Sequence, residues 1–266
     1  MGILKRLFGK PTLNKYGWRP DVPDHRDYRF SHRVTSIVET PEVVDWRPLM
    51  PPIYNQGDLG SCTANALGAG FQYVQIKLKQ PNWVPSRLMI YFMEREMEHT
   101  INEDAGAQIR DGIKVLAKFG VAPEALWPYD VAKFTKKPPE SVYKMASFHQ
   151  ALTYARVDQT AEAMEQCLAQ GFPIVFGFAV FSSFESKEVA KTGMMPMPTK
   201  HEKDLGGHAV IIVGYDRAKK HFIVRNSWGP GWGDKGYFYM PYEYALSASL
   251  CDDFWAIYLV EDEDGK

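Results

Sequence analysis

The sequence NQGDLGSCTANA at residues 55–66 decides the fold, because a glycine-containing turn leads there into a cysteine and then into a helical pattern. Beyond Gly60, apolar residues recur at spacings of three or four, which predicts a helix with a buried face. These residues are Ala64, Leu67, Phe71, Val74 and Leu78. Cys62 would then begin a helix, where the helix dipole and a neighbouring imidazolium favour the thiolate.

Gln56 lies just before Cys62, on the other side of the turn. A thiolate that attacks an acyl carbon creates an oxyanion, and preorganised N–H donors stabilise this charge. The backbone N–H of Cys62 and the side-chain amide of Gln56 can supply two such donors. The segment therefore predicts a nucleophile together with an oxyanion site.

The three cysteines, Cys62, Cys167 and Cys251, contain no C-x-x-C pair. The sequence therefore predicts neither a zinc ribbon nor a disulfide framework, and at least one thiol is free. Cys167 lies in a helical pattern and Cys251 opens a strand-like run, so both are predicted to be buried small side chains. No metal and no cofactor is expected.

Two later segments complete the pattern. GGHAVIIVGYD at residues 206–216 carries His208, and VRNSWGPGWGDKGYF at residues 224–238 carries Asn226. Together with the cysteine segment, they resemble the papain-like cysteine peptidases in order and in local context. His208 follows the cysteine by 146 residues, within the roughly 130–150 that are usual for this type of enzyme.

The resemblance implies a role for each of these residues. His208 would take the proton of the Cys62 thiol and return it to the leaving amine, since an imidazole pKa of about 6.5 suits both steps. Asn226 would orient the imidazole by accepting its N–H, and Trp228 would shield that hydrogen bond from water. Trp228 and Trp232 would also fit the fold as plain core aromatics.

By the same resemblance, four residues would line the subsite for the side chain two residues before the scissile bond: Ala105, Gly106, Gly206 and Ala209. Their small, uncharged side chains predict a preference for an apolar or aromatic residue and offer no partner for a buried charge. The alternative is that the glycines only serve turns.

The chain departs from the family pattern at three positions and in its N-terminal part. Thr63 stands where a tryptophan usually follows the nucleophile, Gly207 where an acidic or amide residue often precedes the histidine, and Leu59 where a disulfide cysteine is usual. The missing bridge favours a reducing compartment. The family's long inhibitory prodomain is also absent, so different regulation is expected.

The resemblance implies an α+β, papain-like fold of two lobes with the active-site cleft between them. Residues 1–43 are predicted to be an N-terminal extension. Residues 44–145 would form a mainly helical lobe with the nucleophile, and residues 146–266 a mainly β lobe, antiparallel and barrel-like, with the histidine and the asparagine. The patterns agree, because residues 109–119 have helical spacing whereas PIVFGFAV and HFIVRNSW are rich in β-branched and aromatic residues.

Residues 11–43 are predicted to contain an extended strap, because prolines and charged residues are mixed there with aromatic residues without a regular period. Four aromatic residues need a surface to bury against: Tyr16, Trp18, Tyr28 and Phe30. One hypothesis is that the strap crosses the cleft and limits access until it is displaced or cut. The alternative is that it packs on the back of the β lobe and only adds stability.

The leading interpretation is an endopeptidase that hydrolyses peptide or protein substrates through a thioester on Cys62. The alternatives are a transpeptidase or amidase, which passes the acyl group elsewhere, and a catalytically silent papain-like binding module. With 31 Lys and Arg against 32 Asp and Glu, no nucleic-acid partner is expected. The sequence contains neither a transmembrane pattern nor a secretory signal at residues 1–10, so a cytoplasmic protein is expected.

Overall fold

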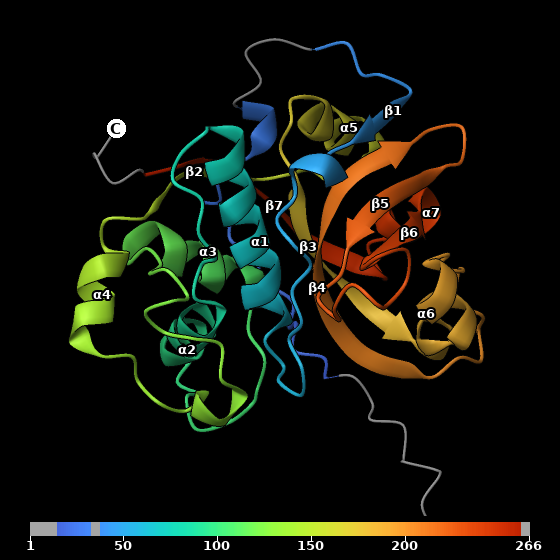
Figure 1. Ribbon diagram of the computed structural model, residues 1–266. Helices are drawn as coiled ribbons and strands as arrows, with labels where there is room; N and C mark the ends of the chain where they lie inside the picture. The colour runs from blue at the N-terminus through green and yellow to red at the C-terminus, as the bar shows by residue number, and fades with distance from the viewer. Residues whose placement is uncertain (1–14, 33–37, 262–266) are drawn as a thin grey trace, which may run out of the picture.

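The computed structural model describes residues 15–32 and 38–261. A group of helices lies on the left of Figure 1 and a twisted sheet on the right, with helix α1 (Cys62–Lys77) between them. The predicted α+β class is confirmed. None of the helices in the described ranges is long and apolar enough to span a membrane. The prediction about residues 1–10 lies outside the described residues.

The helical side contains α1 together with α2 (Arg87–Met97), α3 (Ile109–Lys118) and α4 (Glu140–Ala146). Helix α1 is buried on all sides along residues 62–75, although its pattern predicted one buried face. Small residues explain the difference, because they let the other helices and the sheet approach α1 from opposite sides. A Cβ atom at Gly70, for example, would already lie 3.4 Å from a side-chain carbon of Ile211.

Within the described residues, the sheet has seven strands, and each of the pairs of strands is antiparallel. Its order is β2-β7-β3-β4-β5-β6, and β1 pairs with β4 outside this path. The strands are β1 (Val43–Asp45), β2 (Ala151–Arg156), β3 (Ile174–Phe181), β4 (Asp204–Asp216), β5 (His221–Arg225), β6 (Tyr237–Pro241) and β7 (Cys251–Val260). The sheet is not closed, so the barrel-like description in the prediction is corrected.

The two faces of the sheet bury different partners, as alternating side chains of a strand require. In β4, Ile211 and Val213 face the cluster that contains α1, whereas Val210 and Ile212 face a second core cluster. Three short helices, α5 (Ala161–Ala169), α6 (Lys187–Thr192) and α7 (Tyr242–Ala245), belong to this second side. Strand β4 therefore carries its residues to the boundary between the helices and the rest of the sheet.

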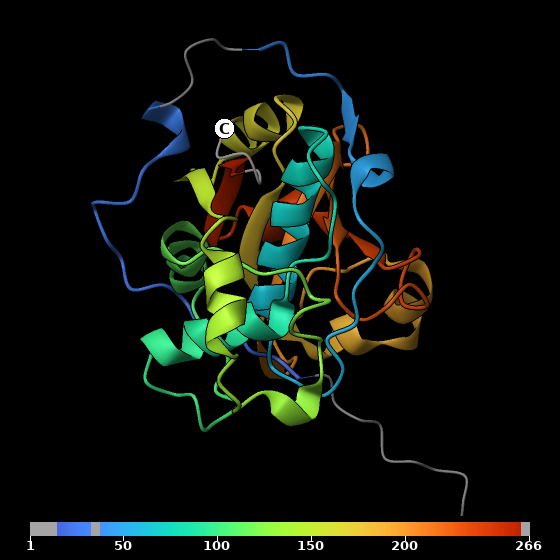
Figure 2. The same ribbon diagram turned by 60° about the vertical axis from the view of Figure 1, so that its left-hand side comes forward.

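The described N-terminal residues 15–32 begin near the lower end of α1 and pass along α3 and β2 to a 3₁₀ turn at Phe30–His32 (Figure 2). Phe30 is buried at 3% exposure, as predicted. Tyr28, in contrast, is 66% exposed, so the prediction that it anchors the strap is wrong. Its ring meets Tyr154 edge-on but stays in water. Residues 11–14 and 33–37 of the predicted strap lie outside the described residues.

Candidate active site

Cys62 is the first residue of α1, as predicted, and its side chain is fully buried. Burial raises the pKa of the thiol to about 11, although hydrogen bonds from the backbone of Ala209 and Gly17 lower it. The expected thiolate-favouring surroundings therefore do not exist in this arrangement, because the loss of water outweighs the helix start. Cys62 is a neutral thiol here.

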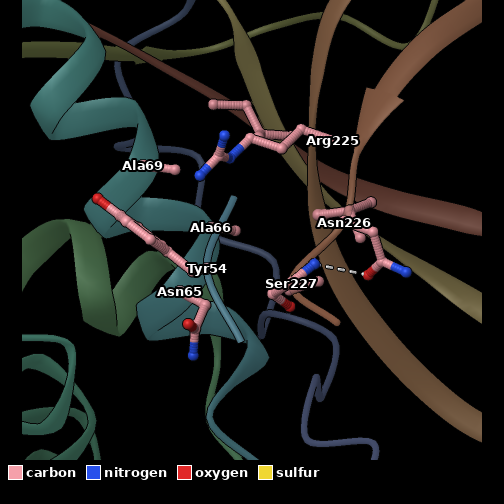
Figure 3. Close-up of a pocket in the computed structure, with 10 residues that line it drawn as sticks. Tyr54, Asn65, Ala66, Ala69, Arg225, Asn226 and Ser227 are labelled. Carbon is pink, nitrogen blue, oxygen red and sulfur yellow. Dashed lines mark hydrogen bonds between the residues drawn. The ribbon is translucent and has the colours of Figure 1, made fainter. Parts of the chain in front are cut away.

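His208 lies in β4 and is also fully buried. Its Nε2 is 2.8 Å from Oδ1 of Asn226, the residue that follows β5. The same oxygen accepts the backbone N–H of Ser227 at 2.8 Å, the dashed line in Figure 3. Asn226 thus holds one ring nitrogen, and among the described residues His208 Nδ1 has no hydrogen-bond partner. The nitrogen left for proton exchange is Nδ1.

Burial lowers the pKa of His208 to about 4, and the hydrogen bond to Asn226 offsets only part of this effect. A thiol with a raised pKa and an imidazole with a lowered pKa are both neutral near pH 7. The backbone of Ala209, the residue after His208, contacts the thiol of Cys62, so the strand that carries the imidazole also reaches the candidate nucleophile. Neither candidate group is ionised in this arrangement.

Aromatic rings surround the imidazole. Trp228 is stacked on it with ring centroids 5.0 Å apart, as the predicted shielding role requires. Tyr16 and Phe178 meet the ring edge-on, each with a centroid distance of 5.8 Å. These contacts exclude water from the hydrogen bond to Asn226, which strengthens it in the low-dielectric surroundings.

Gln56 is buried in the loop before α1, at 1% exposure. Its Oε1 accepts the Ser227 hydroxyl at 2.7 Å, which directs the amide N–H₂ group the other way. The Nε2 atom donates to the carbonyl oxygens of Leu59 at 2.9 Å and of Lys15 at 3.2 Å. The amide predicted to stabilise an oxyanion therefore binds a carbonyl oxygen of the N-terminal segment.

The backbone of residues 15–19 joins the two sides of the molecule at this point. The N–H of Trp18 donates to the carbonyl of Gly207 in β4 at 2.9 Å. On the helical side, the N–H of Ala107 donates to Gly17 at 2.7 Å, and the N–H of Arg19 donates to Ala107 at 3.0 Å. We call residues 15–19 the bridging segment. It makes the kind of backbone hydrogen bonds that an added extended peptide would make.

The four residues predicted to line a substrate subsite lie around the bridging segment. Gly106 packs its backbone on Gly17, and a Cβ atom at Gly206 would point at the side chain of Tyr16. Ala105 is half-buried next to Gly106, and Ala209 is buried beside the thiol. The structure thus brings the four predicted residues to the same region as Cys62.

The region around these four residues also contains a buried carboxylate that the sequence did not predict. Asp253 in β7 is fully buried, and its Oδ2 accepts the indole N–H of Trp18 at 3.0 Å. Sequence reasoning missed this carboxylate because Asp252 and Asp253 resemble a solvated pair at the start of a strand. The positive φ of Asp253, 62°, is what turns its side chain away from the strand pattern.

The family model described as "Papain family cysteine protease" matches residues 40–252. The chain belongs to this family. An uncharacterized peptidase C1-like protein of Acanthamoeba polyphaga mimivirus is 48% identical over 217 residues, which cover 78% of this chain and 70% of the viral protein. Ananain of Ananas comosus is 28% identical over 225 residues, which cover 81% of this chain and 60% of the ananain sequence.

Among solved structures, xylellain, a cysteine protease from Xylella fastidiosa, has 44% sequence identity and a TM-score of 0.84. The match covers 92% of this chain and 96% of xylellain. The papain-like fold predicted from the sequence is therefore confirmed, and the chain is a papain-family cysteine peptidase. These relatives do not support the alternatives of a transpeptidase, an amidase or a catalytically silent binding module.

Thr63 stands where the papain family usually has a tryptophan, and in the structure it forms a buried hydrogen bond. Its hydroxyl donates to Oε2 of Glu94 in α2 at 2.8 Å, and Glu94 is fully buried. Burial raises the pKa of Glu94 to about 8, so this carboxyl is largely protonated at neutral pH. A tryptophan at position 63 would fill space that this buried pair occupies. Glu94 was not predicted, because a charged residue in a helical pattern indicates a solvated face.

The other two cysteines agree with the prediction. Cys167 and Cys251 are buried free thiols. Burial raises the pKa of Cys167 to about 12 and that of Cys251 well above its ordinary value. Neither thiol has contacts with His208 or Gln56 that would activate it, so Cys62 remains the candidate nucleophile.

Proposed function

We propose that this papain-family peptidase is an endopeptidase that covers its own site with the bridging segment and cleaves peptides when the segment leaves. The observation that carries the proposal is the carbonyl oxygen of Lys15 on the Nε2 atom of Gln56, 3.2 Å away. This amide is the donor proposed for the oxyanion. A substrate carbonyl and the Lys15 carbonyl would therefore compete for the same N–H group.

In the proposed reaction, the scissile carbonyl takes the place of the Lys15 carbonyl. His208 Nδ1 takes the proton of the Cys62 thiol, and the sulfur attacks the carbonyl carbon. The oxyanion that forms is stabilised by Gln56 Nε2 and by the backbone N–H of Cys62. His208 returns its proton to the leaving amine, and water then hydrolyses the thioester. Asn226 keeps the imidazole in the orientation that this exchange requires.

The covered site also explains why the Cys62 thiol and the His208 imidazole are both neutral. The backbone of Gly17 contacts the thiol directly, and Tyr16 covers the imidazole. Both contacts belong to the bridging segment and contribute to the burial that keeps the pair neutral. Departure of the segment would admit water, lower the pKa of Cys62 and raise that of His208, which favours the reactive ion pair.

A thiol-directed peptide epoxide tests the nucleophile. We expect mass spectrometry of the labelled, folded protein to find one modified cysteine, Cys62, because the contacts that cover it include Gly17 of the bridging segment, whereas Cys167 and Cys251 belong to the core cluster on the other side of the sheet. The Cys62→Ala variant is the matched control and should take up no label. Modification of Cys167 or Cys251 in the folded protein would contradict the assignment.

The pH dependence of covering follows from Asp21, which lies two residues beyond the bridging segment. Its Oδ2 accepts the indole N–H of Trp255 at 3.0 Å and lies 3.4 Å from Arg156, and its Oδ1 accepts the backbone N–H of Arg110 at 3.0 Å. Its backbone N–H donates to Asp253. Burial, and then the charge of Asp253, raise the pKa of Asp21 to about 7.

The direction of the pH dependence follows from the coupling between docking of the segment and proton binding by Asp21. The docked pKa lies above the ordinary aspartate value, so docking takes up a proton and is strongest at low pH. Docking weakens as pH rises through the window between the ordinary value and about 7, by at most about tenfold per pH unit. We therefore expect the rate of Cys62 labelling in the wild type, divided by that in Asp21→Asn, to rise from pH 5 to 7 and then level off. A ratio that stays constant would disprove the linkage.

Dividing the two rates removes the intrinsic pH dependence of the thiol, which both proteins share. Asparagine keeps an oxygen that can accept from Trp255 but does not titrate in this range. A thermal melt of each protein at every pH separates release of the segment from loss of the fold.

We also propose a cytoplasmic location, because all three cysteines carry free thiols and a reducing compartment keeps them so. Recovery of the tagged protein outside the cytoplasm after cell fractionation would contradict this proposal.

A further inference from the structure

One peptide unit in the turn before Cys62 is bound at both of its ends. It consists of the carbonyl group of Leu59 and the N–H group of Gly60. The carbonyl oxygen accepts from Gln56 Nε2 at 2.9 Å. The N–H donates to the carboxylate of Asp104, 3.0 Å from Oδ1 and 3.2 Å from Oδ2. Because a trans peptide directs its C=O and N–H groups in opposite directions, Gln56 and Asp104 hold this unit from opposite sides.

The carbonyl of Leu59 determines where the side-chain amide of Gln56 directs its two N–H groups. The Ser227 hydroxyl donates to Oε1 of this amide at 2.7 Å, and the carbonyl of Leu59 takes up one N–H of Nε2. The second N–H donates to the carbonyl of Lys15, 3.2 Å away, which occupies the position proposed for the substrate carbonyl. A planar amide bonded in this way cannot rotate without losing a hydrogen bond. The orientation of the Leu59 carbonyl is therefore part of the oxyanion site.

Asp104 is itself held in place from the helical side. Tyr91 in α2 is fully buried, and its hydroxyl donates to Oδ1 of Asp104 at 2.6 Å and accepts the backbone N–H of Gly106 at 3.1 Å. Lys15 of the bridging segment lies 3.2 Å from Oδ2, but its side chain is 52% exposed, and an exposed ion pair of this kind contributes little. The carboxylate therefore keeps its position mainly through Tyr91, whether or not the bridging segment is docked.

The peptide unit needs this acceptor because the backbone at Gly60 is permissive. A glycine has no Cβ atom, so the unit before it can turn over at little steric cost. A flipped unit would take the Leu59 carbonyl away from Gln56 and would direct an N–H group at the amide N–H₂ group instead. No disulfide holds the turn, since Leu59 stands where the family usually has a disulfide cysteine and all three cysteines are free. The hydrogen bond to Asp104 stabilises the observed orientation in its place.

We propose that Asp104 positions the oxyanion donor: by holding the Gly60 N–H, it keeps the preceding carbonyl on Gln56 and directs the second N–H of that amide at the attacked carbonyl. Asp104 contacts neither the substrate nor the reacting atoms, so it acts only through the turn. The inference rests on the proposed peptidase function. Loss of the carboxylate should slow the steps that form an oxyanion and leave other reactions of Cys62 unchanged.

Two reactions of Cys62 separate the positioning of the oxyanion donor from other effects. Cleavage of a fluorogenic peptide forms an oxyanion, whereas in alkylation by iodoacetamide the thiolate displaces iodide from carbon without forming one. Both reactions need the thiolate and an open site, so dividing kcat/KM by the alkylation rate constant of Cys62 cancels both fractions. In the full-length chain carrying Asp104→Ala, we expect this ratio to fall about 10- to 100-fold.

Three further variants identify the interaction that matters. Asp104→Asn keeps an oxygen that can accept from Gly60 and Tyr91, so its ratio should stay close to that of the wild type although the ion pair with Lys15 is lost. Tyr91→Phe removes only the hydroxyl that holds the carboxylate, and should lower the ratio less than Asp104→Ala does. Glu103→Ala is the matched control, because it removes an exposed carboxylate from the neighbouring residue and should leave the ratio unchanged.

An unchanged ratio in Asp104→Ala, with the fold verified by a thermal melt, would overturn the inference. A fall of equal size in Asp104→Asn would also overturn it, because the acceptor for Gly60 is still present there. A crystal structure of Asp104→Ala gives a readout without substrate: we expect the Leu59 carbonyl to have left Gln56, and an unmoved peptide unit contradicts the role of Asp104. If the wild type is alkylated at Cys62 but cleaves no peptide, the peptidase function fails, and the crystal structure still decides the role of Asp104.

Discussion

Cys62→Ala is expected to lower kcat/KM for a peptide substrate by roughly 10⁴- to 10⁶-fold, because the thioester can no longer form. His208→Ala should have an effect of the same order, since no other group at the site exchanges the proton of the thiol. The two changes act on one step, so the double variant should be no worse than either single variant.

Asn226→Ala is expected to retain a measurable remnant, about 10- to 1,000-fold below the wild type, because the imidazole can still meet the thiol without its orienting partner. Steady-state kinetics with one fluorogenic peptide measures all four variants. Asn226 also accepts the buried N–H of Ser227, so its thermal melt must be compared with that of the wild type. Cys167→Ala is the control for replacing a buried thiol and should cleave normally.

Cleavage at the wild-type rate by Cys62→Ala would disprove the mechanism. Retention of activity by His208→Ala would instead show that the thiol loses its proton to another group, and would remove the role given to Nδ1.

The residues of the site could be predicted because the chemistry lies in short, ordered segments. Gln56 and Cys62 lie on the two sides of one short turn. The helical spacing of the apolar residues after Cys62 predicts that a helix begins at Cys62. His208 lies in β4, and Asn226 directly follows β5, the strand that pairs with β4, so pairing of the two strands brings these side chains within hydrogen-bond distance. Local sequence carries this information because each segment forms its own turn, helix or strand.

The electrostatics of the site could not be predicted from the same segments. The burial that raises the pKa of Cys62 is completed by Gly17, which lies far from it in sequence, and Asp253 receives its donors from Trp18 and Asp21. No local pattern links residues more than 200 positions apart. A sequence motif therefore identifies the reacting groups, whereas their protonation state depends on which distant segment covers them.

Helix α2 shows a second limit. Arg87, Glu94 and Arg95 are all buried in it, although charged residues at helical spacing indicate a solvated face. Arg95 is buried because its guanidinium donates to the carbonyls of Ile101 and Glu103 at 2.9 and 3.1 Å. Such partners lie in loops whose course the sequence pattern does not define.

Gly17→Ala is expected to release the bridging segment and to increase the rate of Cys62 labelling by a thiol-directed peptide epoxide. A methyl group at position 17 would overlap the carbonyl oxygen of Gly60, and Gly106 also packs closely against the backbone of Gly17. Both neighbours are backbone and cannot rotate away. Overpacking of this kind costs about 1–3 kcal/mol, which corresponds to about a 5- to 150-fold shift toward the open site.

The rest of the N-terminal segment should stay attached in this variant. Asp27 pairs with the buried Arg110, and Phe30 is packed in the core, so the contacts beyond residue 21 do not depend on Gly17. Gly231→Ala is a matched control, because a Cβ atom there meets no heavy atom within 4 Å. It should fold and label at the wild-type rate. If folded Gly17→Ala and Gly231→Ala react with the epoxide at equal rates, the bridging segment does not restrict access to Cys62, and the catalytic assignment of Cys62 and His208 stands without it.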